Sequence, residues 1–585
     1  MPKIEVFRET LYEYMGSRIA DDEIEELLSV AKAELDGIDE SADVLKIELN
    51  DTNRPDLWST AGLARQLKSY RGAAASSAEL AANGADQGAT ATRYEFFSTP
   101  AKPKTCDRWI NVDENIRPHR PYVAAFGVSG RQIDSVSLKD LIQSQEKLCW
   151  NFGQKRKSIA MGIYRDDLIS YPVKYRGVDP ESTSFVPLQM NRNMSLREIL
   201  SEHPKGREFG SIIGSFPIFP LLEDDHGDVL SMPPIINSER IGTVEVGDER
   251  LFVEMTGTDL RSLLLAVSIV ACDLADTGHK ITPIETRYPF DTEFGRSVVS
   301  PLYFQDPVDV KAADIERMLG VSLSIAEVST ALARMGLDST EAHGIHTVKV
   351  PAYRNDFLHS VDIIEDIMIG RGMQDFNPIM PSEFTAGRLT PEEAFGRSVK
   401  DIMVGLRFQE MIYNYLGSGR DFVTRMCISS DDLVQIANPM SENYEFLRNS
   451  ILPALLGSEA VSAHAVYPHA MFEVGKISRK DADDNHGSVT RNYLGFLVAD
   501  RSAGFNDVSA HVQVLFYYLN FEYSVSEADD PRFIPGRCAR IICDGIVVGL
   551  YGEIHPQVLE NWGIQMPCAA VEIDLDELLA KRSSR

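Results

Sequence analysis

The chain has 585 residues, 44% apolar and 25% charged, which is enough for about four domains with their own cores. Its net charge of −29 disfavours broad nonspecific nucleic-acid binding by the chain alone. It has no run of about 18 uncharged apolar residues, no signal-peptide pattern at residues 1–5 and no C-x-x-C among its seven cysteines. We therefore expect a cytoplasmic protein with reduced thiols and no membrane span.

The N-terminal part, residues 1–94, is predicted to be a small α/β unit followed by a linker. Asp21–Leu35 has the apolar spacing of a helix, and Leu45–Leu49 alternates like a strand. Residues 72–92 are rich in Ala, Gly and Ser without a core pattern, which predicts a flexible linker or a weakly helical surface insertion.

The turn residues Asn53, Arg54, Pro55 and Asp56 precede a predicted helix from Ser59 to Tyr70. An arginine among turn residues either ties the loop together or contacts a ligand. We favour the structural role, because turn carboxylates and amides are ready partners for a guanidinium.

A second module is predicted for residues 95–290. Leu138–Trp150 has helical periodicity and is followed by the basic run Lys155-Arg156-Lys157. This run either contacts phosphates or is a solvated loop that needs no ligand. A strand over Phe252–Asp259 then leads into a predicted helix over Leu260–Ala275, with Thr258 or Asp259 as its cap.

A third module, residues 297–381, contains a helix with several carboxylates. Val361, Ile364, Ile367 and Met368 recur at helical spacing as an apolar stripe. On this helix Asp362, Glu365 and Asp366 share one face, and Asp356 lies in the segment before it. Carboxylates without Cys or His suit a hard cation, Mg²⁺ or Ca²⁺, and a solvated acidic helix face is the alternative.

The last block, residues 385–585, is predicted to alternate helix and strand. The expected elements are helices over Pro391–Leu406 and Ile451–Ala463 and strands over Glu410–Tyr415, Met471–Gly475 and Tyr493–Val498. His555 near Glu553 has the composition of an acid–base pair, but a turn histidine before a proline is more often a packing residue.

The run VPAYRNDFLHSVDIIEDIMIGRGMQDFNPIMP, residues 350–381, resembles the phenylalanyl-tRNA synthetase beta subunit family in its shorter, archaeal and eukaryotic form. The Asn53–Asp56 segment matches that family's N-R-P-D signature. The resemblance implies that Asp356, Asp362, Glu365 and Asp366 hold Mg²⁺ at the contact with an alpha subunit.

The segments Ser231–Glu239 and Phe252–Asp259 resemble the family's editing module, which hydrolyses tyrosine wrongly attached to the phenylalanine tRNA. A pocket for an apolar ring cannot strongly reject the same ring with an added hydroxyl, so a second site is needed. The expected editing residues are Asn237, Ser238, Glu239, Thr256 and Thr258, with Glu239 as the first candidate to recognise the phenol. The alternative is that both threonines cap a helix and Asn237 makes a turn.

The resemblance implies an α+β, multidomain fold with a C-terminal degenerate antiparallel sheet of the class II synthetase type. No F-R-x-E segment and no Gly-x-Gly-x-Gly run ending in Arg is present, so the chain should lack a synthetic active site of its own. We expect a beta subunit that supports ATP-dependent phenylalanine attachment with an alpha subunit, as two alpha and two beta chains, and that binds tRNA but no DNA or membrane. The alternative is a stand-alone RNA-binding or tRNA-editing factor.

Overall fold

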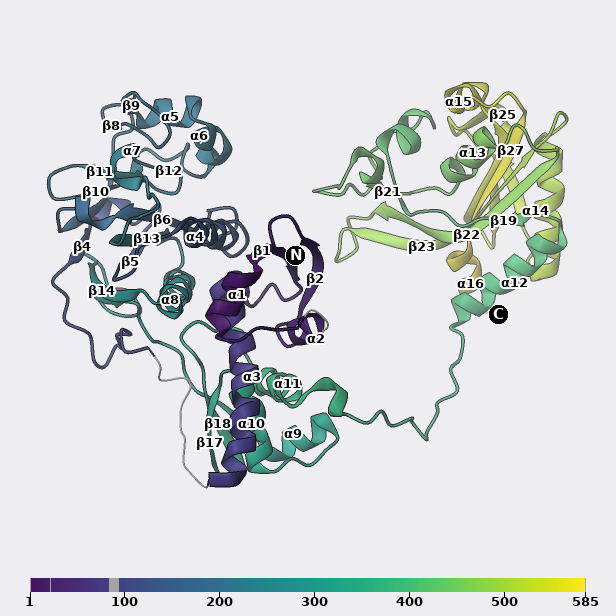
Figure 1. The fold of residues 1–585 in the computed structure, drawn as a ribbon. Helices are drawn as coiled ribbons and strands as arrows, with labels where there is room; N and C mark the ends of the chain where they lie inside the picture. The colour runs from purple at the N-terminus through teal and green to yellow at the C-terminus, as the bar shows by residue number, and fades with distance from the viewer. Residues whose placement is uncertain (1, 21–22, 84–93, 584–585) are drawn as a thin grey trace. The chain divides into compact units, whose positions relative to one another are not determined.

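The computed structural model describes residues 2–20, 23–83 and 94–583. It divides into two compact units, Met1–Ile379 and Met380–Arg585, and each is considered by itself (Figure 1). Both units combine sheets with packed helices, which confirms the α+β fold class. No helix in the described ranges is long and apolar enough to cross a membrane.

The first unit opens with an antiparallel three-stranded sheet in the order β1-β3-β2. Its strands are β1 (Lys3–Phe7), β2 (Ala33–Asp39) and β3 (Val44–Leu49), and its helices are α1 (Arg8–Met15) and α2 (Ile24–Ser29). The strand predicted at 45–49 is confirmed. The helix predicted at 21–35 is wrong after Ser29, because Lys32 turns the chain with a φ of 50° and the following residues pair with β3. Residues 21–22 lie outside the described residues.

The helix predicted from Ser59 is confirmed as α3 (Thr60–Asn83), which follows the short 3₁₀ turn η1 (Pro55–Leu57). It continues through the first half of the Ala-rich stretch, because alanine favours the helix. The remainder of the predicted linker, residues 84–92, lies outside the described residues. In Figure 1 α3 runs alongside α10 (Ile325–Arg334), and the two helices pack together.

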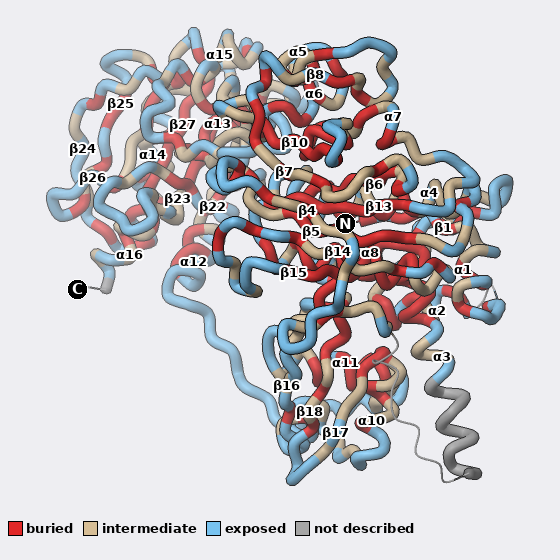
Figure 2. The backbone as a smooth tube through the Cα atoms, turned by 90° about the vertical axis from the view of Figure 1, so that its left-hand side faces the viewer, coloured by how far each residue is buried: buried red, intermediate tan, exposed pale blue. Residues whose placement is uncertain are grey.

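The largest sheet has ten strands, in the order β12-β11-β10-β7-β4-β14-β5-β13-β6 with β15 on β14. Helix α8 (Leu260–Asp276) packs on β5 and β13, and Asp259 caps it through the Ser262 amide. Figure 2 shows that buried chain concentrates on β5, β13, β14 and α8. The strands are β4 (Trp109–Val112), β5 (Tyr122–Ser129), β6 (Ile159–Arg165), β7 (Val173–Val178), β10 (Phe219–Glu223), β11 (Val229–Met232), β12 (Ile236–Asn237), β13 (Leu251–Gly257), β14 (Lys280–Arg287) and β15 (Ser297–Ser300).

A small helical layer lies beside β10 and β11. Phe209, Leu196 and Ile199 belong to its separate apolar cluster together with Phe219 and Met232 of the sheet. The predicted helix at 138–150 is present as α4 with a π-helical extension, η3. The elements of this region are α4 (Ser135–Lys147), η3 (Leu148–Phe152), β8 (Ser184–Phe185), β9 (Met194–Ser195), α5 (Leu196–Glu202), α6 (Pro204–Phe209) and α7 (Glu239–Gly242).

A three-stranded sheet with three helices completes the first unit. Its helix ends agree with the sequence prediction, since Gly320 closes α9 with a φ of 70° and Ser324 caps α10. On α11, however, Val361 is 46% exposed whereas Ile363 is buried, so the predicted apolar stripe is wrong at its first residue. The elements are β16 (Val308–Lys311), α9 (Ala312–Leu319), β17 (Asp338–Ala342), β18 (Ile345–Lys349) and α11 (Ser360–Arg371).

The second unit is built on a seven-stranded, mainly antiparallel sheet in the order β19-β22-β23-β27-β26-β25-β24. Neighbouring residues on each strand face opposite sides: Phe472 packs with α12, α14 and α16, whereas Met471 packs with α13 and α15. This arrangement buries both faces of the sheet and confirms the predicted antiparallel architecture.

All predicted elements of the second unit exist, but the strand predicted at 410–415 is short. It is limited to β19, because Met411 makes the last backbone bond to β22 and the chain then turns away. The bounds are α12 (Pro391–Gly405), β19 (Gln409–Glu410), β20 (Leu416–Gly417), β21 (Phe446–Leu447), α13 (Leu452–Val461), β22 (His469–Lys480), β23 (Ser488–Ala499), α14 (Phe505–Leu519), β24 (Ser524–Glu527), β25 (Phe533–Cys543), β26 (Ile546–Ile554), α15 (Pro556–Trp562), β27 (Cys568–Asp574) and α16 (Leu575–Ser583).

Candidate functional site

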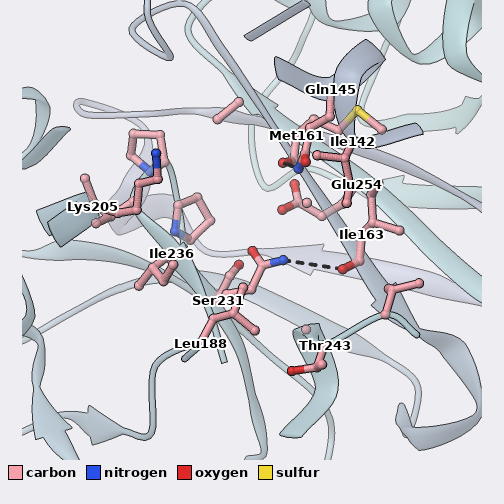
Figure 3. Close-up of a pocket in the computed structure, with 18 of the residues that line it drawn as sticks. Ile142, Gln145, Met161, Ile163, Leu188, Lys205, Ser231, Ile236, Thr243 and Glu254 are labelled. Atoms are coloured by element: carbon pink, nitrogen blue, oxygen red, sulfur yellow. Dashed lines mark hydrogen bonds between the residues drawn. The ribbon is translucent and has the colours of Figure 1, made fainter. Parts of the chain in front are cut away.

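A cavity of about 470 Å³ opens in the first unit between α4, β6, β13 and the loop that carries β12. Its walls are mixed: Met161, Ile163 and Ile236 are apolar, whereas Asn237 and Glu254 are polar. Figure 3 shows Lys205 on the opposite side of this cavity from Met161 and Ile142. A mostly apolar cavity with a few convergent polar groups is the usual form of a small-molecule site.

Glu254 is the most unusual residue of the cavity. It lies in the centre of β13, a strand whose seven residues are all buried, and its side chain is only 3% exposed. Its Oε1 lies 2.8 Å from the Tyr164 hydroxyl, whereas its Oε2 is buried with no hydrogen-bond partner. Burial raises the pKa of this carboxyl to about 7, although Tyr164 and the charge of Arg120 favour the ionised form.

Gly162 makes room for this carboxylate. It is the residue of β6 directly opposite Glu254. A Cβ at Gly162 would lie 2.1 Å from the Tyr164 hydroxyl and 2.5 Å from Glu254 Oε1. A larger residue would therefore displace Glu254, which lines the cavity, and the Tyr164 hydroxyl that is bonded to it.

Two further polar side chains lie beside the Tyr164 hydroxyl. Ser231 Oγ lies 2.8 Å from it, and Asn237 Oδ1 lies 3.4 Å from it. Asn237 also donates from Nδ2 to the carbonyl of Ile163 at 3.4 Å, the bond drawn in Figure 3. The result is a group of polar side chains on one side of a cavity with mixed walls, with one carboxylate oxygen left without a donor.

The structure places the five predicted editing residues at different depths. Asn237 and Glu239 line the cavity, and Ser238 is buried between them with an unpartnered Oγ. The Glu239 carboxylate accepts a hydrogen bond from the Gln189 amide at 2.5 Å, so it braces the neighbouring loop. Thr256 lies deeper, where Arg120 Nε donates to its hydroxyl, and Thr258 is exposed at the end of β13.

The four predicted metal ligands are each bonded to other groups of the protein. Arg354 binds both Asp356, at 2.9 Å, and Asp366, at 2.6 Å. Asp362 accepts hydrogen bonds from the amides of residues 358 and 359, both at 2.7 Å, and caps α11. Glu365 pairs with Lys32 at 2.7 Å.

These contacts do not fit a bound divalent cation in this arrangement. Among the residues that the structure describes, no three His, Cys, Asp or Glu side chains come together as a metal site. Asp356 and Asp366 already share the Arg354 guanidinium. Burial opposes ionisation of Asp356, but the charges of Arg354 and Arg54 outweigh the effect of burial and lower the Asp356 pKa to about 2. Asp366 is more deeply buried, and burial raises its pKa despite Arg354.

Arg54 confirms the structural role favoured for the Asn53–Asp56 turn. Its guanidinium makes two 2.8 Å bonds to Asp56, and both side chains are buried. Arg54 also lies 3.9 Å from Asp356, so the turn and the start of α11 share one buried group of charges.

Sequence reasoning missed Glu254 and Tyr164. A usable signal was present, because Glu254 is the single charged residue in the run Leu251–Thr258, which overlaps the strand predicted over Phe252–Asp259. A carboxylate inside such a strand requires a partner or a ligand. The role of Tyr164 depends on the pairing of β6 with β13, which no local pattern specifies.

Three family models match the chain. Residues 1–73 match the Phe-tRNA synthetase beta subunit B1 domain, residues 308–373 the tRNA synthetase B5 domain, and residues 378–575 the phenylalanyl tRNA synthetase beta chain CLM domain. The first two models match the two ends of the first unit and the third matches most of the second unit, whereas residues 74–307, which include the cavity, lie between the matched ranges.

Curated relatives match over almost the whole length. The phenylalanine–tRNA ligase beta subunit of Borreliella burgdorferi is 44% identical over 583 residues, covering 99% of this chain and 100% of the relative. That of Treponema pallidum subsp. pallidum is 43% identical over 615 residues, with the same coverage. A crystal structure of an N-terminal fragment of the phenylalanyl-tRNA synthetase beta-subunit from Pyrococcus horikoshii matches with a TM-score of 0.57 and 34% identity, covering 63% of this chain and 100% of the fragment.

Proposed function

The chain belongs to the phenylalanine–tRNA ligase beta subunit family, and from this premise we propose that its cavity hydrolyses tyrosine mistakenly attached to the phenylalanine tRNA. The chain is part of an aminoacyl-tRNA ligase, and the editing reaction is the part that its own residues would carry out. The observation that carries the proposal is the buried, partnerless Oε2 of Glu254 in a cavity of otherwise mixed walls.

Glu254 Oε2 is suited to accept a hydrogen bond from a phenol. A phenylalanyl group brings no donor to this oxygen and would leave it buried and unpaired, which costs about 1 to 3 kcal/mol. A tyrosyl group supplies the missing donor. The cavity would thus favour tyrosine over phenylalanine through its polar group, whereas an apolar pocket tolerates an added hydroxyl and cannot separate the two.

The remaining predicted residues have supporting parts in this proposal. Asn237 completes the group of polar side chains beside Tyr164, and Glu239 holds the loop at Gln189. Thr256 fixes Arg120, and Ser238 lies buried between Asn237 and Glu239. Thr258 is exposed at the end of β13, and its part in editing stays a prediction. Neither a Ser-His-Asp nor a Cys-His arrangement lines the cavity in the described chain, so hydrolysis rests on a positioned water and the substrate's own hydroxyls.

An alpha subunit is the proposed partner for ATP-dependent phenylalanine attachment. Ile412, Val461 and Val466 of the second unit are 73–91% exposed. Tyr413 donates to Ser458 at 2.7 Å, which brings the segment of Ile412 beside the helix that ends at Val461. Exposed apolar side chains gathered in this way are typical of a protein contact surface.

Several finer points stay part of the proposal. They are the assembly of two alpha and two beta chains, a cytoplasmic location and the assignment to the short, archaeal and eukaryotic form of the subunit. The full-length relatives named above are bacterial and do not support that last assignment. Magnesium at Asp356, Asp362, Glu365 and Asp366 also stays a prediction. It would require Arg354 and Lys32 to release the carboxylates that they now hold.

The test is hydrolysis of tyrosyl-tRNA by the chain assembled with its alpha subunit. We expect Glu254→Gln to slow this hydrolysis roughly 5- to 150-fold, since the phenol loses a charged acceptor worth about 1 to 3 kcal/mol. Phenylalanine attachment, measured on the same preparation, should remain near the wild-type rate.

Glu249→Gln is the matched control, because it makes the same chemical change at an exposed residue just before β13 and should leave hydrolysis unchanged. Equal hydrolysis by Glu254→Gln and the wild type would remove Glu254 from the proposal. Absence of hydrolysis in the wild-type assembly would refute the editing function itself. Hydrolysis by the chain without an alpha subunit would favour a stand-alone editing factor.

A further inference from the structure

We propose that Trp150, Lys155 and Lys157 bind the single-stranded 3′ end of a tRNA on its way into the cavity. The identity of the RNA rests on the proposed editing function. The binding surface itself rests on a cluster of aromatic and cationic side chains that leads from the exposed Trp150 to the cavity wall.

The loop that carries the basic run has an unusual backbone conformation. Gln154, Lys155 and Arg156 all have positive φ angles, 51°, 55° and 66°, a region that residues other than glycine rarely adopt. Hydrogen bonds hold them there: the amides of Lys155 and Arg156 donate to the carbonyls of Trp150 and Cys149 at 2.8 and 2.9 Å. Such strained backbone persists only where its surroundings fix it, and it is common at functional sites.

Cationic side chains contact two neighbouring aromatic rings in this region. Lys155 Nζ lies 5.2 Å from the Trp150 ring centre, and the Trp150 and Phe209 rings are 6.5 Å apart. Arg156 lies 4.3 Å and Lys205 5.4 Å from the Phe209 ring. These contacts join five side chains from two segments into one continuous cluster.

The cluster ends in the cavity. Arg156 and Lys205 line it, and Arg156 Nη1 donates to the carbonyls of Pro234 and Ile235 at 3.2 and 3.0 Å. At the other end Trp150 is 47% exposed. Within the described ranges, neither Lys155 nor Lys157 forms an ion pair with a carboxylate, whereas Lys205 pairs with Glu208 at 3.0 Å. The chain as a whole carries a net charge of −29.

This arrangement fits a single RNA strand. The amino acid to be removed is attached to the terminal ribose, so the preceding nucleotides must cross the cavity mouth as a single strand. An exposed indole offers a stacking surface for a base, and the cations of Lys155, against that indole, and of Lys157, in the same loop, attract the phosphates. The overall negative charge of the chain confines this attraction to the cluster.

The experiment measures binding of the full chain to a short single-stranded RNA that ends in C-C-A, across a range of salt concentrations. Trp150→Ala should weaken binding roughly 5- to 150-fold, the loss expected for one stacked base. The double variant Lys155→Ala, Lys157→Ala should lower the slope of log affinity against log salt by about 1.4, since each lost phosphate contact on a single strand contributes about 0.7.

Lys280→Ala is the matched charge control, because Lys280 is an exposed lysine of the same unit at the start of β14. Thermal melting of each variant verifies the fold. If Trp150→Ala and the double variant bind RNA like Lys280→Ala, the inference is wrong. If the cluster variants lose RNA binding while the wild-type assembly fails to hydrolyse tyrosyl-tRNA, the editing proposal falls and the RNA surface stands.

Discussion

Glu254 shows how one residue places a carboxylate in a buried strand whose other residues are uncharged. Phe252, Glu254 and Thr256 lie on the same side of β13. Phe252 packs against the ring of Tyr164, Glu254 accepts a hydrogen bond from the Tyr164 hydroxyl, and Thr256 accepts one from Arg120. Of the three, only the Glu254 carboxylate retains an unpartnered oxygen. A buried, incompletely bonded carboxylate is costly, and proteins retain such groups mainly where a ligand completes the bonding.

The raised pKa of Glu254 predicts a specific dependence of stability on pH. With a pKa of about 7 in the fold and an ordinary value of 4.5, Glu254 takes up a proton on folding between these two pH values. Stability should therefore fall as pH rises from about 4.5 to 7 and level off above 7, at up to about 1.4 kcal/mol per pH unit.

Urea unfolding at pH 5, 6, 7 and 8, followed by tryptophan fluorescence, tests this dependence. Glu254→Gln cannot ionise, so its stability should fall less across the same range. Asp273, whose pKa burial raises to about 6, contributes with the same sign in both proteins, so the difference between them isolates Glu254. Parallel pH profiles for the two proteins would contradict the raised pKa.

The carboxylates of α11 differ in burial, although their spacing predicts that they share one face of the helix. Asp366 is 4% exposed and bonded to Arg354, whereas Glu365 is exposed and paired with Lys32. We expect Asp366→Asn to destabilise the first unit by about 3 kcal/mol, because it leaves the buried Arg354 with one charged partner fewer. Glu365→Gln should cost less than about 1 kcal/mol.

The same two variants test the magnesium prediction. If Mg²⁺ binds at these carboxylates, it should raise the melting temperature of the wild type relative to a chelator, and Glu365→Gln should reduce that increase without loss of fold. A melting temperature that is the same with Mg²⁺ and with chelator would exclude the metal under those conditions. Chemical denaturation of Asp366→Asn, compared with Glu365→Gln, measures separately how much the Asp366–Arg354 ion pair contributes to the stability of the fold.

At the scale of elements, the sequence predicts helix ends best where the residues at the end itself determine them. Gly320 and Ser324 mark the end of α9 and the start of α10, because a left-handed residue and a side-chain cap are local requirements. The segment that begins at Ala33 is predicted wrongly, because a distant contact determines its structure. Its helical apolar spacing is overridden by pairing with β3, a contact made by residues farther along the chain.

Helices α10 and α11 approach each other closely at Gly370. A Cβ at this position would lie 2.0 Å from the carbonyl oxygen of Ala331, which is backbone and cannot move aside easily. Arg334 Nη1 also donates to the carbonyl of Gly370 at 3.0 Å. Glycine at this position therefore reflects packing between helices rather than backbone conformation.

Gly370→Ala should destabilise the first unit by about 1 to 3 kcal/mol through overpacking, measured by urea unfolding. Gly72→Ala is the matched control. Gly72 also lies inside a helix, α3, but a Cβ there meets nothing within 4 Å, so alanine should stabilise by up to about 1 kcal/mol. Equal stabilities for the two variants would mean that the α10–α11 contact is looser than the structure indicates.

At the scale of the whole molecule, one apolar core crosses three of the segments distinguished by sequence. It contains Leu63 of α3, Val267 of α8 and Ile367 of α11, and it extends through the first unit. The division at 1–94, 95–290, 297–381 and 385–585 stays a prediction, and the structure itself separates at Ile379. Composition and turns mark where the chain changes character, but shared cores form between segments distant in sequence.

On one face of the sheet in the second unit, buried arginine and glutamate side chains pair with one another. Arg448 makes bonds of 2.7 and 2.9 Å to Glu473, and Arg532 bonds to Glu572 at 2.8 Å, all with buried side chains. Ser450 binds the other oxygen of Glu572 at 2.7 Å. The carboxylates and guanidiniums on this face thus neutralise one another, and the sequence motifs that hold ATP in active class II domains are absent.

The chain purified alone should accordingly show no phenylalanine-dependent ATP–pyrophosphate exchange. Exchange should appear when an alpha subunit is added, and gel filtration should show the two proteins eluting together. The reason is physical: a nucleotide would have to displace buried, fully bonded ion pairs, and breaking one such pair costs about 3 to 5 kcal/mol. Exchange by the pure chain, sensitive to Arg448→Ala, would show that this face binds ATP and overturn the structural role. Failure to elute with an alpha subunit, combined with deacylation by the chain alone, would instead identify a stand-alone editing factor.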